Sequence, residues 1–396
     1  MRVVVAHNFY GARAAGGESV VYQQEIDLLR ANGHEVETLE YENAEIADYS
    51  WKEKFAFPFS FGFSQRVYDD AVRLFRRFRP EILHVHNYKY VMTPAVFQAA
   101  KDCGVKTALT LHNYRLICPG GQLRRGDQIC EECLHRNPIR ILWRSKCASK
   151  SSARLIQYAF YRETRALLLK NVDVYIALTN FARDKFIEGG LPADRIRVKS
   201  NFLFDPLAGS SGERQETENA PAIFVGRLAS EKGVRFMIDA WRDISRPLIV
   251  VGDGPEDEWA RRHAPENVTF VGRQSHAETL ELMRGAALLI FPSVWYEGQP
   301  MTLLEACALG VPMVASDLGP RGETVIPEVS GLLYRSLNRG EFVTAVRRLD
   351  GDESLRWRLS QGARRLYEEN FTPEKNIAAL EEIYRFVLES TGCGRN

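Results

Sequence analysis

Residues 291–316 read FPSVWYEGQPMTLLEACALGVPMVAS, and the rest of the chain is organised around this stretch. An apolar run ends in a Pro-Ser turn, the letters GQP predict a second tight turn, and residues 302–309 are predicted to form a helix. The first turn of that helix would carry unpaired N–H groups and a partial positive charge, which favours an anion such as a diphosphate. Glu297 and Glu305 are placed to bracket one extended ligand at this turn.

The length and composition of the chain indicate two globular domains. A chain of 396 residues suits two domains of roughly 200 residues each. Hydrophobic residues make up 45% and charged residues 26%, which is ordinary for a globular protein. No apolar run approaches the ~20 residues of a membrane span, and Met1 leads directly into the strand-like RVVVAH. A cytoplasmic protein is therefore expected.

The charge of the chain is unevenly distributed, although the net charge is only +1. Residues 115–170 carry 12 basic and 4 acidic side chains. This region lacks the aromatic and glycine signature of an RNA-binding module, so nucleic acid is not an expected partner. Two interpretations stay open: the cations attract anionic lipid head groups or a phosphate-bearing acceptor, which would bring the protein to the inner face of a membrane, or they are an evenly solvated surface.

The start of the chain predicts a doubly wound parallel sheet. A buried-type strand at 2–7, a glycine-rich loop at 11–17 and a helix at 18–32 open a βαβ unit. The dinucleotide fingerprint Gly-x-Gly-x-x-Gly is absent from this loop. Further core strands end in His84, His86 and His112, and strand ends of this kind are where ligands bind in open α/β sheets.

The E-x7-E spacing, set among the elements FPS, EG, EA and GVPMVAS, resembles the retaining glycosyltransferases of family 4. The stretch AIFVGRLASEKGV at 222–234 resembles the donor-phosphate clamp of the same family. The resemblance spans nearly the whole chain and implies the α/β GT-B fold, in which two Rossmann-like domains hold a nucleotide-sugar in the cleft between them. The domains would be 1–203, completed by a C-terminal helix at 375–396, and 204–374.

The resemblance also implies roles for individual residues. His112 and Glu297 would lie at the reacting sugar, and Glu305 would hold the ribose hydroxyls. Arg227 and Lys232, two cations at a strand-to-helix turn, are placed to neutralise a diphosphate, so no catalytic metal or other cofactor is expected. The predicted donor-binding residues are Gly16, Gly17, Arg227, Lys232, Gly272, Arg273, Gly298, Gln299, Pro300, Met301, Thr302 and Glu305. For the glycine loop, a plain loop-to-helix turn is the alternative.

The implied activity is transfer of a hexose from a nucleotide-sugar to a polysaccharide or a lipid-linked saccharide, with retention of anomeric configuration. UDP-glucose or a similar UDP-sugar is favoured as the donor, and GDP-mannose is the alternative. Two other functions are compatible with a chain of this architecture: a nucleotide-sugar 2-epimerase and a catalytically silent sugar-binding scaffold.

Two further features lie outside the implied donor site. Four cysteines at C-x11-C-x2-C-x13-C spacing resemble a structural zinc site, and free thiols or one or two disulfides are the alternatives. These residues are Cys118, Cys130, Cys133 and Cys147. An aromatic-rich stretch at 51–64 is expected either near the acceptor or a membrane surface, or packed beneath its own loop.

Overall fold

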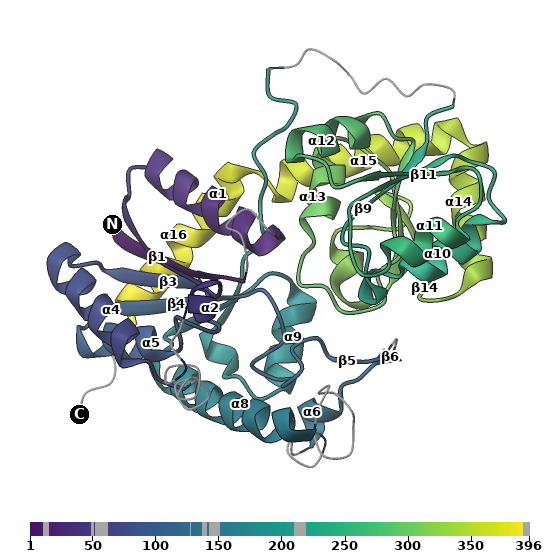
Figure 1. Cartoon of the computed structure of the whole chain (residues 1–396). Helices are drawn as coiled ribbons and strands as arrows, with labels where there is room; N and C mark the ends of the chain where they lie inside the picture. The colour runs from purple at the N-terminus through teal and green to yellow at the C-terminus, as the bar shows by residue number, and fades with distance from the viewer. Residues whose placement is uncertain are drawn as a thin grey trace. The chain divides into compact units, whose positions relative to one another are not determined.

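A computed structural model describes residues 1–10, 16–48, 51, 62–126, 128–136, 141, 151–209 and 219–390 (Figure 1). For residues 151–157, 159 and 160 only the backbone is described. Most of the glycine loop, most of the aromatic stretch, Cys147 and most of the polar segment at 209–221 therefore lie outside the described residues. The chain divides into two compact units, the first formed by Met1–Arg125, Cys130–Ser200 and Asn376–Asn396, the second by Gly126–Ile129 and Asn201–Lys375.

The first unit is built on a six-stranded sheet in the order β2-β1-β3-β4-β7-β8, with every pair of neighbours parallel. Its strands are β1 (Arg2–Phe9), β2 (Glu35–Glu42), β3 (Ile82–Asn87), β4 (Lys106–Leu111), β7 (Val174–Ala177) and β8 (Ile196–Val198). The run Val3–Val5 in β1 is fully buried, as expected for a parallel strand covered on both faces. A two-stranded sheet, β5 (Arg124–Arg125) with β6 (Gln128–Ile129), follows β4 in the chain.

Helices cover this sheet, and several begin at side chains that cap them. The helices are α1 (Gly17–Ala31), α2 (Glu45–Asp48), α4 (Gln65–Phe78), α5 (Ala95–Asp102), α6 (Glu132–His135), α8 (Ser151–Asn171), α9 (Asn180–Glu188) and α16 (Pro373–Glu389). Ser64 caps α4 and Thr179 caps α9, each accepting a backbone N–H of the first turn. Most of α16 belongs to the first unit, beside which it is drawn in yellow in Figure 1.

The second unit repeats this plan with the strand order β11-β10-β9-β12-β13-β14, again all parallel. Its strands are β9 (Ala222–Val225), β10 (Leu248–Val251), β11 (Val268–Gly272), β12 (Leu288–Phe291), β13 (Met313–Asp317) and β14 (Gly331–Arg335). Its α-helices are α10 (Val234–Trp241), α11 (Asp257–His263), α12 (His276–Arg284), α13 (Met301–Ala308), α14 (Arg339–Gly351) and α15 (Glu353–Asn370). The two parallel sheets confirm the predicted fold class.

Each sheet has one point where the strand order reverses, and this point positions the ligand-binding loops. In the first unit the chain proceeds outward in opposite directions from β1 and β3, and in the second from β9 and β12. Loops that follow such a pair of strands separate and leave a crevice at their carboxyl ends. No helix in the described part of the chain is long and apolar enough to cross a membrane.

Candidate functional site

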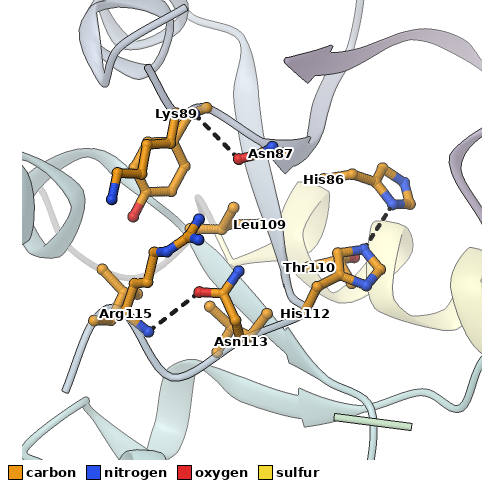
Figure 2. Close-up of a pocket in the computed structure, with 11 residues that line it drawn as sticks. His86, Asn87, Lys89, Leu109, Thr110, His112, Asn113 and Arg115 are labelled. Atoms are coloured by element: carbon orange, nitrogen blue, oxygen red, sulfur yellow. Dashed lines mark hydrogen bonds between the residues drawn. The ribbon is translucent and has the colours of Figure 1, made fainter. Parts of the chain in front are cut away.

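A pocket in the first unit lies at the carboxyl ends of β3 and β4 (Figure 2). Eleven residues line it, and His86, Lys89, His112 and Arg115 supply its titratable side chains apart from a tyrosine. Burial, and then the charge of Arg115, lower the pKa of Lys89 to about 7. An arginine and a lysine that ionises near neutral pH therefore share a poorly hydrated pocket, an arrangement that favours an anionic or strongly polar ligand.

The start of α1 adds an acidic group near Arg115. Gly16 and Gly17 are exposed and open the helix, and Gly16 has a φ of 107°, which favours glycine. Glu18 follows them, and burial raises the pKa of its carboxyl to about 8 against the opposing charge of Arg115. The Arg115 guanidinium also donates a hydrogen bond to the Tyr10 hydroxyl.

Behind the pocket lies a fully buried cluster centred on Glu25. Its Oε1 is 2.9 Å from His84 Nδ1 and 3.2 Å from His86 Nε2, and its Oε2 is 2.7 Å from Lys199 Nζ. His86 Nδ1 in turn is 3.1 Å from His112 Nε2, the contact drawn as a dashed line in Figure 2. Burial, and then the neighbouring His86, hold the pKa of His112 well below its usual range. His112, the predicted sugar contact, is therefore a neutral ring at the edge of the pocket.

In the second unit, Lys232 and Glu297 meet where the strand order reverses. Lys232 ends a short 3-10 turn after β9, and its Nζ is 2.7 Å from Glu297 Oε1 in the loop after β12. The next residue, Gly233, has a φ of 71°, and a Cβ there would lie 2.1 Å from the carbonyl oxygen of Pro292. The two loops are thus in direct backbone contact, which fixes the position of the lysine beside the glutamate.

The loop that carries Glu297 is held from beneath by polar side chains. Ser293 donates to Glu297 Oε1 at 2.7 Å, and the buried guanidinium of Arg321 donates to the backbone carbonyls of Ser293 and Trp295. Burial alone would raise the pKa of Glu297, but Lys232, Ser293 and Arg321 outweigh it and lower that pKa. Glu297 is therefore a fixed, ionised hydrogen-bond acceptor.

Glu305 lies on α13 and has a different partner. It is 7% exposed, and its Oε1 is 3.0 Å from Nε2 of the more exposed His276 on α12. The hydrogen bond to Glu305 raises the pKa of His276 above its ordinary value. The stabilisation from this pair is therefore present below the ordinary histidine pKa and is lost as the pH rises through the raised one.

The turn before α13 behaves largely as the sequence predicts. Pro300 is the residue that caps the helix, which starts at Met301, one position earlier than predicted. The side chain of Gln299 accepts a hydrogen bond from the backbone N–H of Asn201 at 2.6 Å, and its carbonyl accepts another from the Asn201 amide. The side-chain oxygen and the backbone carbonyl of Gln299 thus both hold the turn. Gly298 and Thr302 flank the same turn.

Three residues predicted to contact the nucleotide-sugar are two exposed arginines and a glycine at a turn. Arg227 and Arg273 are exposed, and neither forms an ion pair with another residue that the structure describes. Gly272 ends β11 with a φ of 73° and has nothing within 4 Å of where a Cβ would stand. These positions leave both arginines available to a ligand.

The described cysteines of the predicted zinc site lie around the small sheet β5–β6. The Cys133 thiol donates to Cys118, and this bond, together with the N–H groups of residues 121–123 and against burial, lowers the pKa of Cys118 to about 6. Cys130 pairs through its backbone with Leu123 and accepts a bond from Arg125 at 3.3 Å. A thiol that ionises near neutral pH suits a metal ligand. The structural zinc stays a prediction, with Cys147 outside the described residues.

The zinc prediction has a direct test. Purified protein is expected to carry about one zinc per chain, measured by elemental analysis, because four thiolates complete a tetrahedral site. The double change Cys130→Ser and Cys133→Ser should remove the metal and lower the melting temperature, since metal binding contributes folding free energy. Cys307→Ser, at a buried cysteine of the second unit, is the control and should retain the metal. Metal-free protein with an unchanged melting temperature in the double variant would contradict the prediction.

Two other groups of residues within the described ranges could be mistaken for metal sites. Glu25, His84 and His86 form one, and Glu131, His135 and Glu188 form the other. In each group a lysine already contacts the carboxylates: Lys199 lies 2.7 Å from Glu25, and Lys185 lies 2.8 and 2.9 Å from Glu131 and Glu188. Lys199 balances the single charge of Glu25, whereas Glu131 and Glu188 share one lysine, so both groups are ion-pair networks and only the first is balanced by its lysine.

Two doubly wound α/β units, each with charged side chains at the reversal point of its sheet, define the GT-B class of enzyme. The family model described as "Glycosyltransferase Family 4" matches residues 15–203, and the one described as "Glycosyl transferases group 1" matches residues 211–366. The chain belongs to these glycosyltransferases. The match of one model to each unit confirms the resemblance seen in the sequence.

Individual relatives agree with this assignment. The glycogen synthase of Mycobacterium tuberculosis is 32% identical over 184 residues, 44% of this chain and 44% of that protein. The O-antigen chain mannosyltransferase C of Escherichia coli is 30% identical over 175 residues, 42% of this chain and 47% of that protein. The alignments thus span less than half the length of these curated relatives. Sucrose-phosphate synthase from Thermosynechococcus elongatus has the same fold, with a TM-score of 0.71 at 18% identity, and covers 99% of this chain and 100% of its own.

A second solved structure with the same fold is that of HepE from Anabaena in complex with UDP. It gives a TM-score of 0.66 at 16% identity, and the match covers 98% of this chain and 100% of that one. At this level of identity, the likeness extends to the fold alone.

Several residues that build the site were not found from the sequence. Glu25 and Lys199 are far apart in the chain and meet only through the sheet, so no motif marks them. Ser293 lies in the quoted stretch, but its bond to Glu297 depends on the shape of the turn. Arg321 and His276 lie outside the quoted stretch, and the sequence does not show that the first is buried beneath the Glu297 loop or that the second pairs with Glu305.

Proposed function

We propose that this chain is a retaining glycosyltransferase that moves a hexosyl group from a nucleotide-sugar to a polysaccharide or a lipid-linked saccharide. The observation that supports the proposal most is the pairing of Lys232 with Glu297, 2.7 Å apart at the reversal point of the second sheet. This pair lies in the loops that precede α10 and α13. The second unit thus brings together a cation, an ionised hydrogen-bond acceptor and the N-terminus of α13.

In the proposed reaction, the bond between the anomeric carbon and the diphosphate oxygen breaks, and the acceptor oxygen forms the new bond on the same face. The acceptor proton passes to the departing phosphate. Negative charge grows on the diphosphate, so Lys232, the exposed Arg227 and the first N–H groups of α13 would stabilise the transition state. Glu297 would accept hydrogen bonds from the hydroxyls of the transferred sugar, and His112 would contact the same sugar.

The donor is proposed to be UDP-glucose or a similar UDP-sugar. HepE, which shares the fold, has been solved in complex with UDP-glucose, and this supports the choice only by analogy. The mannosyltransferase among the relatives keeps GDP-mannose as the alternative donor. Contact of the cationic region at 115–170 with an anionic membrane surface likewise stays a prediction.

Donor turnover without an acceptor tests the proposal. The protein is incubated with UDP-glucose or GDP-mannose, and the products are separated by ion-pair chromatography. A transferase is expected to release nucleoside diphosphate slowly, an epimerase to isomerise the sugar, and a scaffold to do neither. Thermal shift with each donor ranks the bases, because a bound ligand stabilises by RT ln(1 + [L]/Kd).

The change Glu305→Gln is expected to raise the donor KM about tenfold while kcat stays nearly intact. The ribose that Glu305 is proposed to hold barely changes during the reaction, so its loss removes uniform binding. Steady-state kinetics with varied donor measure both constants. His276→Gln, which removes the partner at 3.0 Å but keeps the carboxylate, is the control and should shift KM less. Loss of turnover at saturating donor in Glu305→Gln would show that its role was misassigned.

A further inference from the structure

We propose that Glu25 is a positioning residue that determines, through His86, which ring nitrogen of His112 carries the proton. The inference rests on the proposed function, in which His112 contacts the transferred sugar. Glu25 itself is fully buried in α1 and is not one of the residues that line the pocket. Its contact with the lining is the one to His86 at 3.2 Å, so it can act on the reaction only through the histidines.

The charge state of Glu25 sets the direction of the hydrogen bonds. Burial alone would raise its pKa, but the Lys199 ammonium and the neighbouring His84 and His86 outweigh burial and hold that pKa well below its usual range. Glu25 is therefore a carboxylate, which can only accept hydrogen bonds. Lys199 donates to Oε2 at 2.7 Å, so His84 and His86 must both donate to Oε1.

The protonation of His86 then determines which nitrogen donates in its hydrogen bond with His112. The proposal takes His86 as neutral, because Lys199 already balances the charge of Glu25 and a further buried cation would have no counter-charge. The one proton of His86 is then on Nε2, facing Glu25. Its Nδ1 must then accept, and the donor 3.1 Å away is Nε2 of His112. The proton of neutral His112 is thus fixed on Nε2, and its Nδ1 keeps a lone pair. That nitrogen has no hydrogen-bond partner among the residues of the described ranges, and the ring lines the pocket, so it would accept a hydrogen bond from a hydroxyl of the sugar.

A second branch of the cluster runs through His84 to α16 and provides a control. His84 Nε2 lies 2.7 Å from the Thr110 hydroxyl, and its Nδ1 lies 2.9 Å from the hydroxyl of Tyr384 on α16. Removing the Tyr384 hydroxyl disturbs the same buried cluster without altering the contact between Glu25 and His86. If Glu25 had a purely structural role, changes at Glu25 and at Tyr384 should affect His112 similarly. The proposal predicts that only the change at Glu25 alters the His112 tautomer.

The decisive variant is Glu25→Gln. Lys199 will hold the amide oxygen of the glutamine, so the amide NH2 faces the histidines. His86 must then accept at Nε2 and carry its proton on Nδ1, which forces His112 Nε2 to accept and moves the His112 proton to Nδ1. Nitrogen-15 NMR of histidine-labelled full-length protein reads which nitrogen is protonated, and the His112 signals are assigned by their loss in His112→Gln. We expect exchange of the His86 and His112 tautomers, with donor kcat about 10- to 100-fold lower and KM little changed.

A compensating change separates positioning from structure. In Glu25→Gln with Lys199→Met, the amide is free to turn its oxygen to the histidines, so the wild-type tautomers and part of kcat should return. Glu25→Met with Lys199→Met leaves no acceptor and should give a mixture of tautomers; this pair contains no lone buried charge, so it tests the proposal even if Glu25→Gln alone fails to fold.

The outcomes are distinct. Unchanged His112 tautomers in Glu25→Gln, or in Glu25→Met with Lys199→Met, would overturn the proposal, as would a changed tautomer in Tyr384→Phe. The proposal is supported if the His86 and His112 tautomers exchange in Glu25→Gln and the wild-type tautomers return in Glu25→Gln with Lys199→Met. If wild-type protein turns over no nucleotide-sugar, the proposed function fails while the NMR comparison still decides the role of Glu25.

Discussion

Replacing Lys232 by alanine is expected to lower kcat for donor turnover by about 10²- to 10³-fold, the loss typical of one preorganised donor to a developing oxyanion. Negative charge on the departing diphosphate grows in the transition state, so the ammonium stabilises that state more than bound donor. The donor KM should change less than kcat. Steady-state kinetics at saturating donor measure the effect, and full kcat in Lys232→Ala would exclude this role.

The structure adds a second consequence to the same change. Glu297 is 6% exposed and its Oε1 is 2.7 Å from Lys232 Nζ, so the variant leaves a buried carboxylate without its cation. Lys232→Ala and Glu297→Gln should therefore be non-additive, with the double variant about as impaired as the worse single one. Arg235→Ala, which breaks the more exposed ion pair of Arg235 with Glu256, is the control and should keep wild-type kcat.

Replacing Gly233 by alanine is expected to lower the free energy of unfolding by about 3 kcal/mol, because it combines a left-handed residue with a backbone overlap. The new Cβ would stand 2.1 Å from the carbonyl oxygen of Pro292, and the φ of 71° is unfavourable for any side chain. The turn must shift, which moves Lys232 away from Glu297. Donor turnover should fall with stability, and thermal unfolding should show a loss of roughly 6–12 °C.

Gly104→Ala isolates the two contributions. Gly104 has the same φ of 71° but nothing within 4 Å of where its Cβ would stand, and it lies in the other unit. This variant carries the backbone cost without the overlap, so it should lose about 1 kcal/mol and keep donor turnover. Equal losses in the two glycine variants would show that contact with Pro292 does not hold the Lys232 turn.

The architecture could be predicted from the sequence because it depends on local patterns. Buried strands such as 2–7 are recognised as runs rich in β-branched residues, and the predicted C-terminal helix at 375–396 corresponds to α16, which spans Pro373–Glu389. The comparisons confirm the fold class and the family. The helix after Gly298 begins at Met301 and not at Thr302, a difference of one position that propensity cannot resolve.

The remaining features depend on contacts between distant segments. The sequence marks Glu25 as an ordinary helical residue, and only its contacts with the histidines of β3 and with Lys199, just after β8, make it the centre of an ion-pair cluster. The pairing of Lys232 with Glu297 likewise depends on which strands neighbour each other in the sheet. For Gln299 the pattern predicted a ligand contact, which stays a prediction, and it did not show that the side chain also anchors Asn201. Spacing along a chain does not say which polar atoms are already satisfied.

Helix α16 makes the first unit discontinuous in the chain, and this bears on how the protein is synthesised. Residues 1–200 leave the ribosome first, yet Asn376 and Tyr384, which contact Lys199 and His84, follow only after the whole second unit. At 5–20 residues per second, that interval is on the order of ten seconds or more. During it, the buried ion pairs beneath the pocket lack the helix that covers them, so the half made first is the half completed last.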